Sequence, residues 1–404
     1  MPTRRRERRV LAREMPAELQ VASANGSTVT DSRGRKYIDF VMGWCVGNFG
    51  WRPAAIAKAI ERFRGPDYVY PGYSYAPWTE LARLLVSLAP RPLTTCFRAT
   101  GGSEAVDLAL QAAMAHTGRR AFLSLEDSYH GNSLGGLSIG SSENRESIRN
   151  LLPHCGKIAP PLDAKALRRI EQRLKRRDVA AFVMEPISIN LGVLIPERSV
   201  IQRVRDICRR YGTLFVADEV ATGFGRTGRV FACEHFDLDV DIITIAKGIA
   251  SGMPLGVTAA RADVMTWPPG AHASTFGGNP VSAAAALATI KVLKGGVIQN
   301  AATVGAHMID RLKGLMDKHQ LIGDVRGKGL MIGVELVRDR TTKERATTER
   351  DQVVQAMFHK GVLILGAGRN AIRFAPPMVL TREQADSIVN IFDDVLGTIA
   401  VKRS

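Results

Sequence analysis

Three charged residues stand at or just past the ends of apolar runs, where a charged side chain usually has a task. Glu185 ends VAAFVME, Asp218 ends TLFVAD and Lys247 follows IITIA. Burial of a lysine is costly and lowers its pKa, which makes Lys247 a candidate nucleophile for a carbonyl group. The alternative for Lys247 is a side chain that extends its charged end to solvent.

Asp218 begins the string DEVATGFGRTG, 29 residues before Lys247. A carboxylate at a strand end can hold a buried ring nitrogen protonated, as a pyridine cofactor requires when it withdraws electrons from a substrate. A helix cap or a surface acid pair would explain Asp218 and Glu219 alone. The glycines and the arginine of the whole string point to a more specific loop.

The string ATGGSEAVDLALQAAM places Gly101, Gly102 and Ser103 before an amphipathic helix. A helix start of this kind offers free backbone N–H groups and a positive dipole end, which suit a phosphate. The same letters also fit a simple cap, in which Ser103 accepts from the backbone and Glu104 lies in the first turn.

Two further strings combine aromatic or hydroxyl side chains with glycine. In DSYHGNSLGGLS, Tyr129 and His130 precede a glycine, and an aromatic ring there can lie flat on a planar cofactor. A Tyr-His pair also occurs in ordinary core packing. In ASTFGGNP, Thr275 and the glycines form a polar turn before a helix.

The elements that position these residues follow from the apolar runs. Residues 121–125, 179–186, 213–220 and 241–248 read as buried strands between helices or loops, which predicts an α/β fold with a mainly parallel sheet. Ligands of such sheets bind at the carboxyl ends of the strands, where Glu185, Asp218 and Lys247 lie.

The chain ends predict a smaller lobe. Residues 26–43 read as two strands joined by a turn, and a helix near 301–319 precedes strands near VRGKGLMIGVEL and AIRFAPP. We therefore predict an N-terminal part of the small lobe at 1–60, a large domain at 61–295 and a C-terminal small domain at 296–404.

Bulk composition excludes several classes of protein. The chain has 404 residues, of which 45% are hydrophobic and 23% are charged, so it is globular rather than disordered. Five cysteines without a CxxC pair predict reduced thiols, no metal site and a cytoplasmic location. No secretory signal and no uninterrupted apolar run of eighteen residues occur, so we expect no membrane span.

The net charge of +16 raises the possibility of a nucleic-acid surface. A basic stretch, residues 162–178, has leucine and isoleucine at helical spacing, which predicts a docked helix with a charged outer face. No aromatic residues stand between its charges, as binding of single strands would require. A solvated face is the favoured interpretation.

Taken together, these strings resemble the class III aminotransferases, pyridoxal-phosphate (PLP) enzymes of fold type I. The resemblance runs from GSTVTDSRGRKYIDF to IRFAPP, and DEVATGFGRTGRVFACEHF, AKGIASGMPLG and STFGGNP follow in the family's order. It implies a large domain with a central sheet and a small α/β lobe built from both chain ends.

The resemblance also implies roles for single residues. Lys247 matches the Schiff-base lysine, and Asp218 matches the partner of the pyridine nitrogen. Tyr129 and Val220 would pack on the two ring faces, with His130 beside Tyr129 in the same string. Thr275 matches a threonine that reaches the phosphate in the neighbouring subunit, which implies a homodimer.

Further matches concern the phosphate and the substrate. Gly102 and Ser103, next to Gly101, match the phosphate-binding step. Arg373 matches the arginine that grips a substrate carboxylate, for which a guanidinium fork is suited. Glu185 matches a glutamate that pairs with this arginine when the substrate has no such carboxylate.

The sequence departs from the family at several points. Ala221 stands where glutamine is frequent, SINLG (188–192) replaces Gln-Gly-Glu-Gly, and Trp51 replaces the histidine of a frequent Gly-His. Trp44 follows Gly43, which approaches the substrate in the family, so its indole would narrow the pocket or form an apolar wall.

The implied function is transfer of an amino group from an ω-amino acid, a diamine or an amine to pyruvate or 2-oxoglutarate, in ping-pong order. Lys247 would move the proton at the substrate carbon. Relatives with the same lysine act as racemases, aminomutases or decarboxylating transaminases. A basic nucleic-acid-binding protein that retains the fold is the least favoured alternative.

Overall fold

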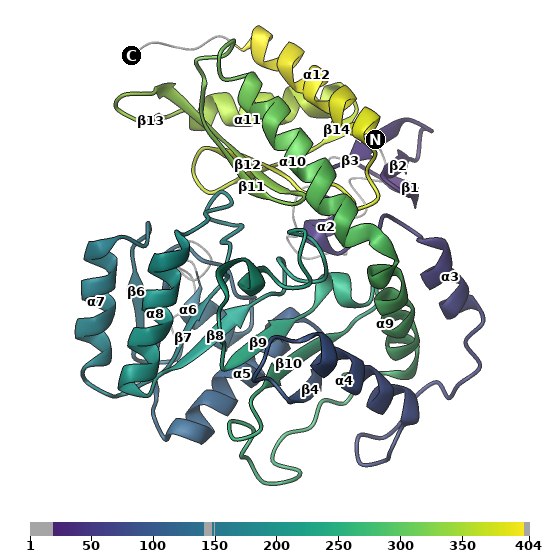
Figure 1. Cartoon of the computed structure of the whole chain (residues 1–404). Coiled ribbons are helices and arrows are strands. Elements are labelled where there is room, and N and C mark those ends of the chain that lie inside the picture. Colours follow the sequence, from purple (N-terminus) through teal and green to yellow (C-terminus); the bar gives the residue numbers. More distant parts are fainter. Residues whose placement is uncertain (1–18, 141–147, 149, 400–404) are drawn as a thin grey trace.

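The computed structural model describes residues 19–140, 148 and 150–399, which form a large domain with a smaller lobe above it (Figure 1). A seven-stranded sheet lies at the centre of the large domain, in the order β4-β10-β9-β8-β7-β5-β6. The strands from β9 to β6 are parallel, and β10 is antiparallel to both of its neighbours. In chain order the strands are β4 (Thr95–Ala99), β5 (Ala121–Leu125), β6 (Cys155–Ile158), β7 (Val179–Met184), β8 (Leu214–Asp218), β9 (Ile242–Ile245) and β10 (Gly256–Ala260).

Helices cover both faces of this sheet. Val106 of the helix α5 belongs to an apolar cluster with Val216 of β8 on one face, whereas Val204 of α8 clusters with Phe215 on the other. Burial on both faces explains why the strands β5, β7, β8 and β9 are largely apolar. The helices of this domain are α3 (Ala54–Glu61), α4 (Ala76–Leu88), α5 (Gly102–Thr117), α6 (Leu134–Ile139), α7 (Ala164–Leu174), α8 (Arg198–Tyr211) and α9 (Pro280–Val292), with short turns η2 (Ala232–Phe236) and η3 (Lys247–Ile249).

The small lobe contains segments from both ends of the chain. Its first sheet has the order β1-β2-β3-β14, and β3 pairs in parallel with β14, so that the backbone N–H of Ile38 donates to the carbonyl of Gly361. Its second sheet has the order β11-β12-β16-β15, with β13 paired to β12. The elements are β1 (Val21–Asn25), β2 (Thr28–Asp31), β3 (Lys36–Asp39), β11 (Ile322–Lys328), β12 (Met331–Asp339), β13 (Glu344–Arg345), β14 (Val362–Leu363), β15 (Leu365–Ala367), β16 (Ala371–Phe374), α10 (Ile298–Gly314), α11 (Thr347–His359) and α12 (Arg382–Thr398).

This arrangement confirms the predicted fold class, a mainly parallel sheet in a large domain with a small lobe from both chain ends. The four predicted strands correspond to β5, β7, β8 and β9. The basic stretch forms α7 with Ile170 and Leu174 buried, as the spacing predicted. The domain limits at residues 60 and 295 stay a prediction.

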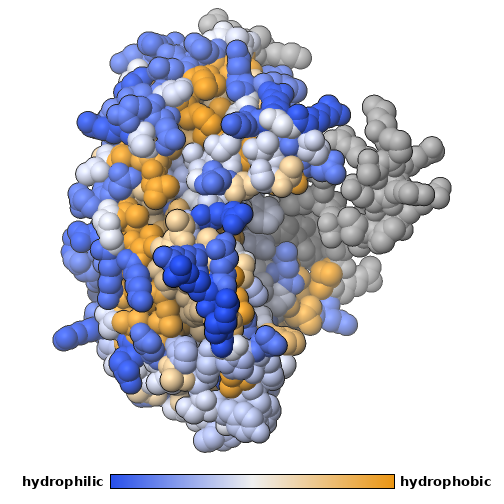
Figure 2. Space-filling model, turned by 90° about the vertical axis from the view of Figure 1, so that its right-hand side faces the viewer, coloured by the Kyte–Doolittle hydropathy of each residue, from blue (hydrophilic) through white to orange (hydrophobic). Residues whose placement is uncertain are grey.

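A nearly continuous helical stretch, Pro280–Gly314, links the two parts of the molecule (Figure 1). It consists of α9, a short π-helical segment η4 (Leu293–Val297) with Gly296 at a φ of 98°, and α10. By length and composition alone the stretch is apolar enough to cross a membrane. Ala286 and Ile290 of α9 are instead buried in the core, which is the common reason for such a composition. Figure 2 shows the side on which α3 and α9 lie, with strips of apolar residues between charged ones.

Candidate active site

A cavity of about 570 Å³ lies at the carboxyl ends of β7, β8 and β9, facing the small lobe. It brings together residues that are far apart in the chain, from Trp44 to Arg373. The predicted site residues that line it are Trp44, Gly101, Gly102, Ser103, Tyr129, His130, Glu185, Asp218, Val220, Lys247 and Arg373. Of the predicted site residues, only Thr275 is absent from its lining.

Asp218 is the last residue of β8, and its carboxylate is buried. One oxygen lies 2.6 Å from Nδ1 of His130, and the other accepts from the Thr244 hydroxyl at 3.0 Å and the Val220 backbone N–H at 3.1 Å. Burial favours the neutral acid, but the hydrogen bonds, led by that of His130, lower the pKa of Asp218. The site therefore holds a fixed negative charge at the end of a central strand.

Lys247 follows β9 after a single residue, Ala246. Its φ of 48° lies in the left-handed region, which a lysine rarely adopts. Backbone strain of this kind persists where the surroundings determine the conformation, and it is frequent in functional sites. A Cβ at position 248 would lie 2.5 Å from the Asn48 side-chain nitrogen. Only glycine therefore fits at the position after Lys247.

The start of α5 forms an open cradle beside Asp218. Gly101 precedes the helix in an extended conformation and gives it no side-chain cap, which leaves backbone N–H groups for a ligand. A Cβ on Gly102 would lie 2.9 Å from Val220 Cγ1, so glycine allows the helix to approach this side chain. The Ser103 hydroxyl accepts from the backbone N–H of Asn132 at 3.3 Å.

Glu185 follows β7 and is buried, and its Oε2 has no hydrogen-bond partner among the described residues. Burial and repulsion from Asp218 raise its pKa well above the ordinary value, although Lys247 and Arg373 act in the opposite direction. Arg373, on β16, is also buried, but its guanidinium lies beyond 4 Å of every carboxylate in the part of the chain described. The two residues share the cavity without forming an ion pair.

The segment that departs from the family pattern, 188–192, forms a tight loop at the cavity. Ser188 and Leu194 exchange backbone hydrogen bonds of 2.9 Å, and Gly192 has a φ of 83°. Arg326 of β11 donates to the carbonyl of Gly192 at 2.7 Å, which ties the loop to the small lobe. Asn190 of this loop lines the cavity. This position was not predicted from the sequence, because no feature of the loop sequence indicates it.

His130 and Thr244 contact different oxygens of Asp218, and Tyr129 precedes His130 in the chain. Burial and the charge of Asp218 raise the pKa of the Tyr129 hydroxyl, so it stays protonated. His130 is fully enclosed, and its Nε2 has no partner among the described residues. Asn132, two residues further along, also lines the cavity and was not predicted, because nothing in its string distinguishes it.

Thr275 lies outside the cavity, in an exposed loop before α9. Its neighbour Phe276 is 64% exposed, and the Phe276 ring centroid lies 6.1 Å from that of Tyr68. Tyr70 and Tyr73 are also more than half exposed, at 59% and 70%. In a single chain Thr275 is therefore exposed, next to the exposed ring of Phe276.

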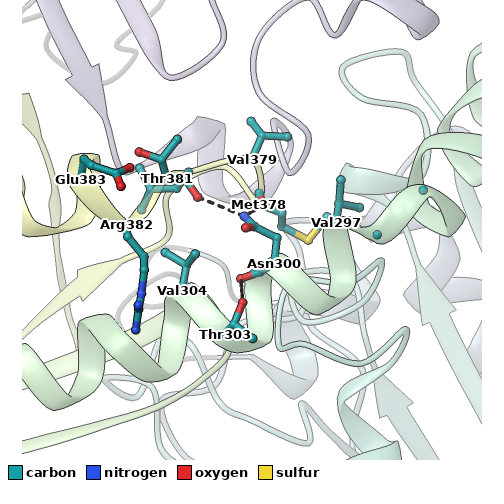
Figure 3. Close-up of a pocket in the computed structure, with 12 residues that line it drawn as sticks. Val297, Asn300, Thr303, Val304, Met378, Val379, Thr381, Arg382 and Glu383 are labelled. Atoms are coloured by element: carbon teal, nitrogen blue, oxygen red, sulfur yellow. Dashed lines mark hydrogen bonds between the residues drawn. The ribbon is translucent and has the colours of Figure 1, made fainter.

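A second cavity, of about 780 Å³, opens between the start of α10 and the loop after β16 (Figure 3). Asn300 donates from its side chain to the carbonyl of Met378 at 2.6 Å, and Thr303 bonds to the backbone of its own helix. These polar groups are already satisfied, and none of the predicted site residues lies there. Among the described residues, no group of three His, Cys, Asp or Glu is placed to hold a metal ion.

The residues of the first cavity fit PLP by their chemistry. The uncapped helix start at Gly102 suits a phosphate, and the buried carboxylate of Asp218 suits a protonated ring nitrogen. Val220 and Tyr129 line the space between them, and Lys247 supplies the amine that an aldehyde requires. The fold and this site define a PLP-dependent enzyme of fold type I.

The chain belongs to the class III aminotransferase family, since the model of Aminotransferase class-III matches residues 10–396. It is 36% identical to the acetylornithine aminotransferase of Methanosarcina mazei, over 93% of this chain and 91% of the relative. It is 35% identical to the leucine/methionine racemase of Thermococcus litoralis, over 92% of this chain and 88% of the relative.

The comparison with solved structures agrees. An amine transaminase from an uncultivated Pseudomonas species, described in its PLP-bound form, has a TM-score of 0.90 and is 30% identical, with 96% of this chain and 98% of that one covered. The predicted family, enzyme class and cofactor are therefore confirmed. The two curated relatives differ in reaction, so the substrate requires a separate argument.

Proposed function

We propose that the protein transfers an amino group from an ω-amino acid, a diamine or an amine to a 2-oxo acid such as pyruvate or 2-oxoglutarate. The observation that carries this proposal is the position of Arg373, a buried guanidinium in the same cavity as Lys247 that has no carboxylate partner among the described residues. A guanidinium in such a place suits the carboxylate of a 2-oxo acid. The proposed order is ping-pong, because both substrates use one cavity.

PLP supplies an aldehyde that takes up the amino group and a ring that withdraws electrons from the substrate carbon. Lys247 would hold the cofactor covalently and, once released, carry the proton at the substrate carbon as a general acid and base. Asp218 would keep the ring nitrogen protonated through its fixed negative charge. Tyr129 and Val220 would hold the ring between them, and Gly102 and Ser103 would bind its phosphate.

Glu185 and Arg373 would let one cavity accept substrates with and without a carboxylate near the reacting carbon. A 2-oxo acid would pair with Arg373, whereas an amine without such a group would leave Arg373 to Glu185. The burial of both residues in one cavity supports this arrangement. Trp44 would limit the size of the substrate group that lies beside Glu185 and Arg373.

The protein is further proposed to act as a homodimer in which Thr275 of one subunit reaches the phosphate in the other. The exposure of Thr275 outside the cavity, next to the exposed Phe276, supports this proposal. Exposed apolar and aromatic groups of this kind mark contact surfaces. Sedimentation should give twice the mass of one chain, and Thr275→Ala should weaken PLP binding without unfolding the protein.

Absorbance spectroscopy tests the proposed reaction. The purified protein, saturated with PLP, should show a visible band that bleaches with an ω-amine and returns after pyruvate or 2-oxoglutarate is added. The same cycle in Arg373→Ala should require a much higher concentration of 2-oxo acid, whereas the bleaching by the amine should change little. A band that never responds to 2-oxo acids would contradict the proposal.

Racemisation is the second candidate, because a leucine/methionine racemase covers nearly the whole chain at 35% identity. A racemase would convert an L-amino acid to its mirror image and exchange its α-hydrogen with deuterated water in the absence of any 2-oxo acid. Measuring optical rotation and deuterium content in such a mixture separates the two reactions.

A further inference from the structure

The turn α2 (Met42–Cys45) has an unusual backbone. All four of its residues have positive φ: 47° at Met42, 56° at Gly43, 58° at Trp44 and 72° at Cys45. Only Gly43 adopts this region without a steric penalty, so three residues are held in a costly conformation. Such a turn persists only where its surroundings fix it.

The carboxylate of Asp39, at the end of β3, binds this turn. Its Oδ1 accepts from the backbone N–H groups of Val41 at 2.7 Å and Met42 at 2.8 Å. Its Oδ2 accepts from the indole N–H of Trp51 at 2.9 Å. Asp39 is buried, so these charge-assisted bonds are shielded from water.

The Trp51 indole packs beneath the turn. A Cβ on Gly43 would lie 3.2 Å from Cη2 of Trp51, and one on Gly47 would lie 3.5 Å from the same ring. The Trp51 backbone exchanges two hydrogen bonds with Gly26, at 2.8 and 2.9 Å. Trp51 is thus anchored to the hairpin of β1 and β2, as is Asp39, whose N–H donates to Ser27.

The turn has an inner and an outer side. Met42 and Cys45 are buried in the core, whereas Trp44 is 50% exposed and lines the cavity together with Val46. A right-handed or extended backbone here would direct these side chains differently, because φ sets the direction of each Cα–Cβ bond. The position of the Trp44 indole therefore depends on the left-handed turn.

We propose that Asp39 and Trp51 are positioning residues that hold Trp44 as a rigid wall of the substrate pocket. This wall selects short, unbranched amines over amines with a branched or aromatic group next to the nitrogen. The inference rests on the proposed function, and it concerns a residue, Trp51, that stands where the family frequently has histidine.

Four proteins test this inference: the wild type, Trp51→Phe, Trp44→Ala and the double variant. Trp51→Phe keeps an aromatic ring but removes the pyrrole part of the indole, including the N–H that bonds to Asp39. The PLP-loaded proteins are titrated with two unreactive acids, acetate and 2-phenylpropionate, by the shift of the visible band. Trp51→Phe should improve binding of the bulky acid relative to acetate by about three- to tenfold, the worth of one buried hydrogen bond.

The double variant decides whether this effect passes through Trp44. In the Trp44→Ala background, Trp51→Phe should change the ratio of the two dissociation constants by less than about twofold. An equal change in both backgrounds, or no change in either, would overturn the proposal. Trp51→His, which keeps an N–H donor, should retain more of the wild-type ratio than Trp51→Phe.

A second readout does not depend on catalysis. This readout is acrylamide quenching of tryptophan fluorescence in the cofactor-free proteins. The signal of Trp44 is the difference between a protein that contains Trp44 and the same protein with Trp44→Ala. Trp51→Phe should raise the quenching of Trp44 about twofold or more as the turn loosens. Unchanged quenching would contradict the role of the clamp, whereas absence of transamination with increased quenching would contradict only the proposed function.

Discussion

Replacement of Asp218 by asparagine tests the electrostatic basis of the site. The side chain is 3% exposed, and asparagine preserves its shape and can still accept from Thr244 and Val220. What it loses is a negative charge. Two unit charges about 4 Å apart interact by about 4 kcal/mol at an effective dielectric constant of about 20. If the charge acts mainly in the transition state, the rate should fall about a thousandfold.

The assay is turnover with saturating amine, 2-oxo acid and PLP, so that weaker cofactor binding does not enter the rate. Thermal unfolding of the cofactor-free variant serves as the control for the fold. Thr244→Val, which removes one neutral hydrogen bond to the same carboxylate, should cost about tenfold or less. A rate for Asp218→Asn within tenfold of the wild type would refute the assignment of Asp218 to the ring nitrogen.

Three further predictions concern other parts of the molecule. Lys247→Ala should abolish turnover while PLP is still bound noncovalently, which dialysis and absorbance would show; full turnover would contradict its role. Arg373→Ala should raise KM for 2-oxo acids by about a hundredfold or more, the worth of a buried charged pair, with little change for a simple amine in steady-state kinetics. Hydrogen bonds from His319 and Lys318 lower the pKa of Asp393, so its stabilising contribution should be present above about pH 4, the ordinary value, and decline at lower pH. Urea unfolding should therefore show a larger difference between wild type and Asp393→Asn at pH 6 than at pH 3.

The central part of the fold could be predicted from sequence because its strands are buried on both faces. The strands β5, β7, β8 and β9 consist largely of apolar residues, and a charged residue stands at the end of each strand or within two residues after it. The strands β4, β6 and β10 were not predicted. Their sequences, TCFRA, CGKI and GVTAA, mix polar or small residues with apolar ones, and their pairing is set by the neighbouring strands.

The candidate site was predictable to the extent that strand ends and helix starts position it. Lys247, Asp218 and Gly102 occupy such places, and the parallel sheet brings them to one edge. The left-handed turn that presents Trp44 was not predictable, since only one of its residues is glycine. The position of Asn190 in the cavity lining was not predictable either, because its loop is held by a long-range contact with Arg326 of the small lobe.

The charges of the cavity bear on how two unlike substrates can use it in turn. Lys247 and Arg373 lower the pKa of Glu185, whereas burial and Asp218 raise it, so the protonation of this carboxyl depends on what its neighbours bind. A carboxylate bound to Arg373 would cancel one of the two lowering charges and favour neutral Glu185. A substrate without a carboxylate would leave Arg373 charged and favour ionised Glu185. Under the proposed function, the protonation of Glu185 would therefore depend on whether the substrate in the cavity carries a carboxylate.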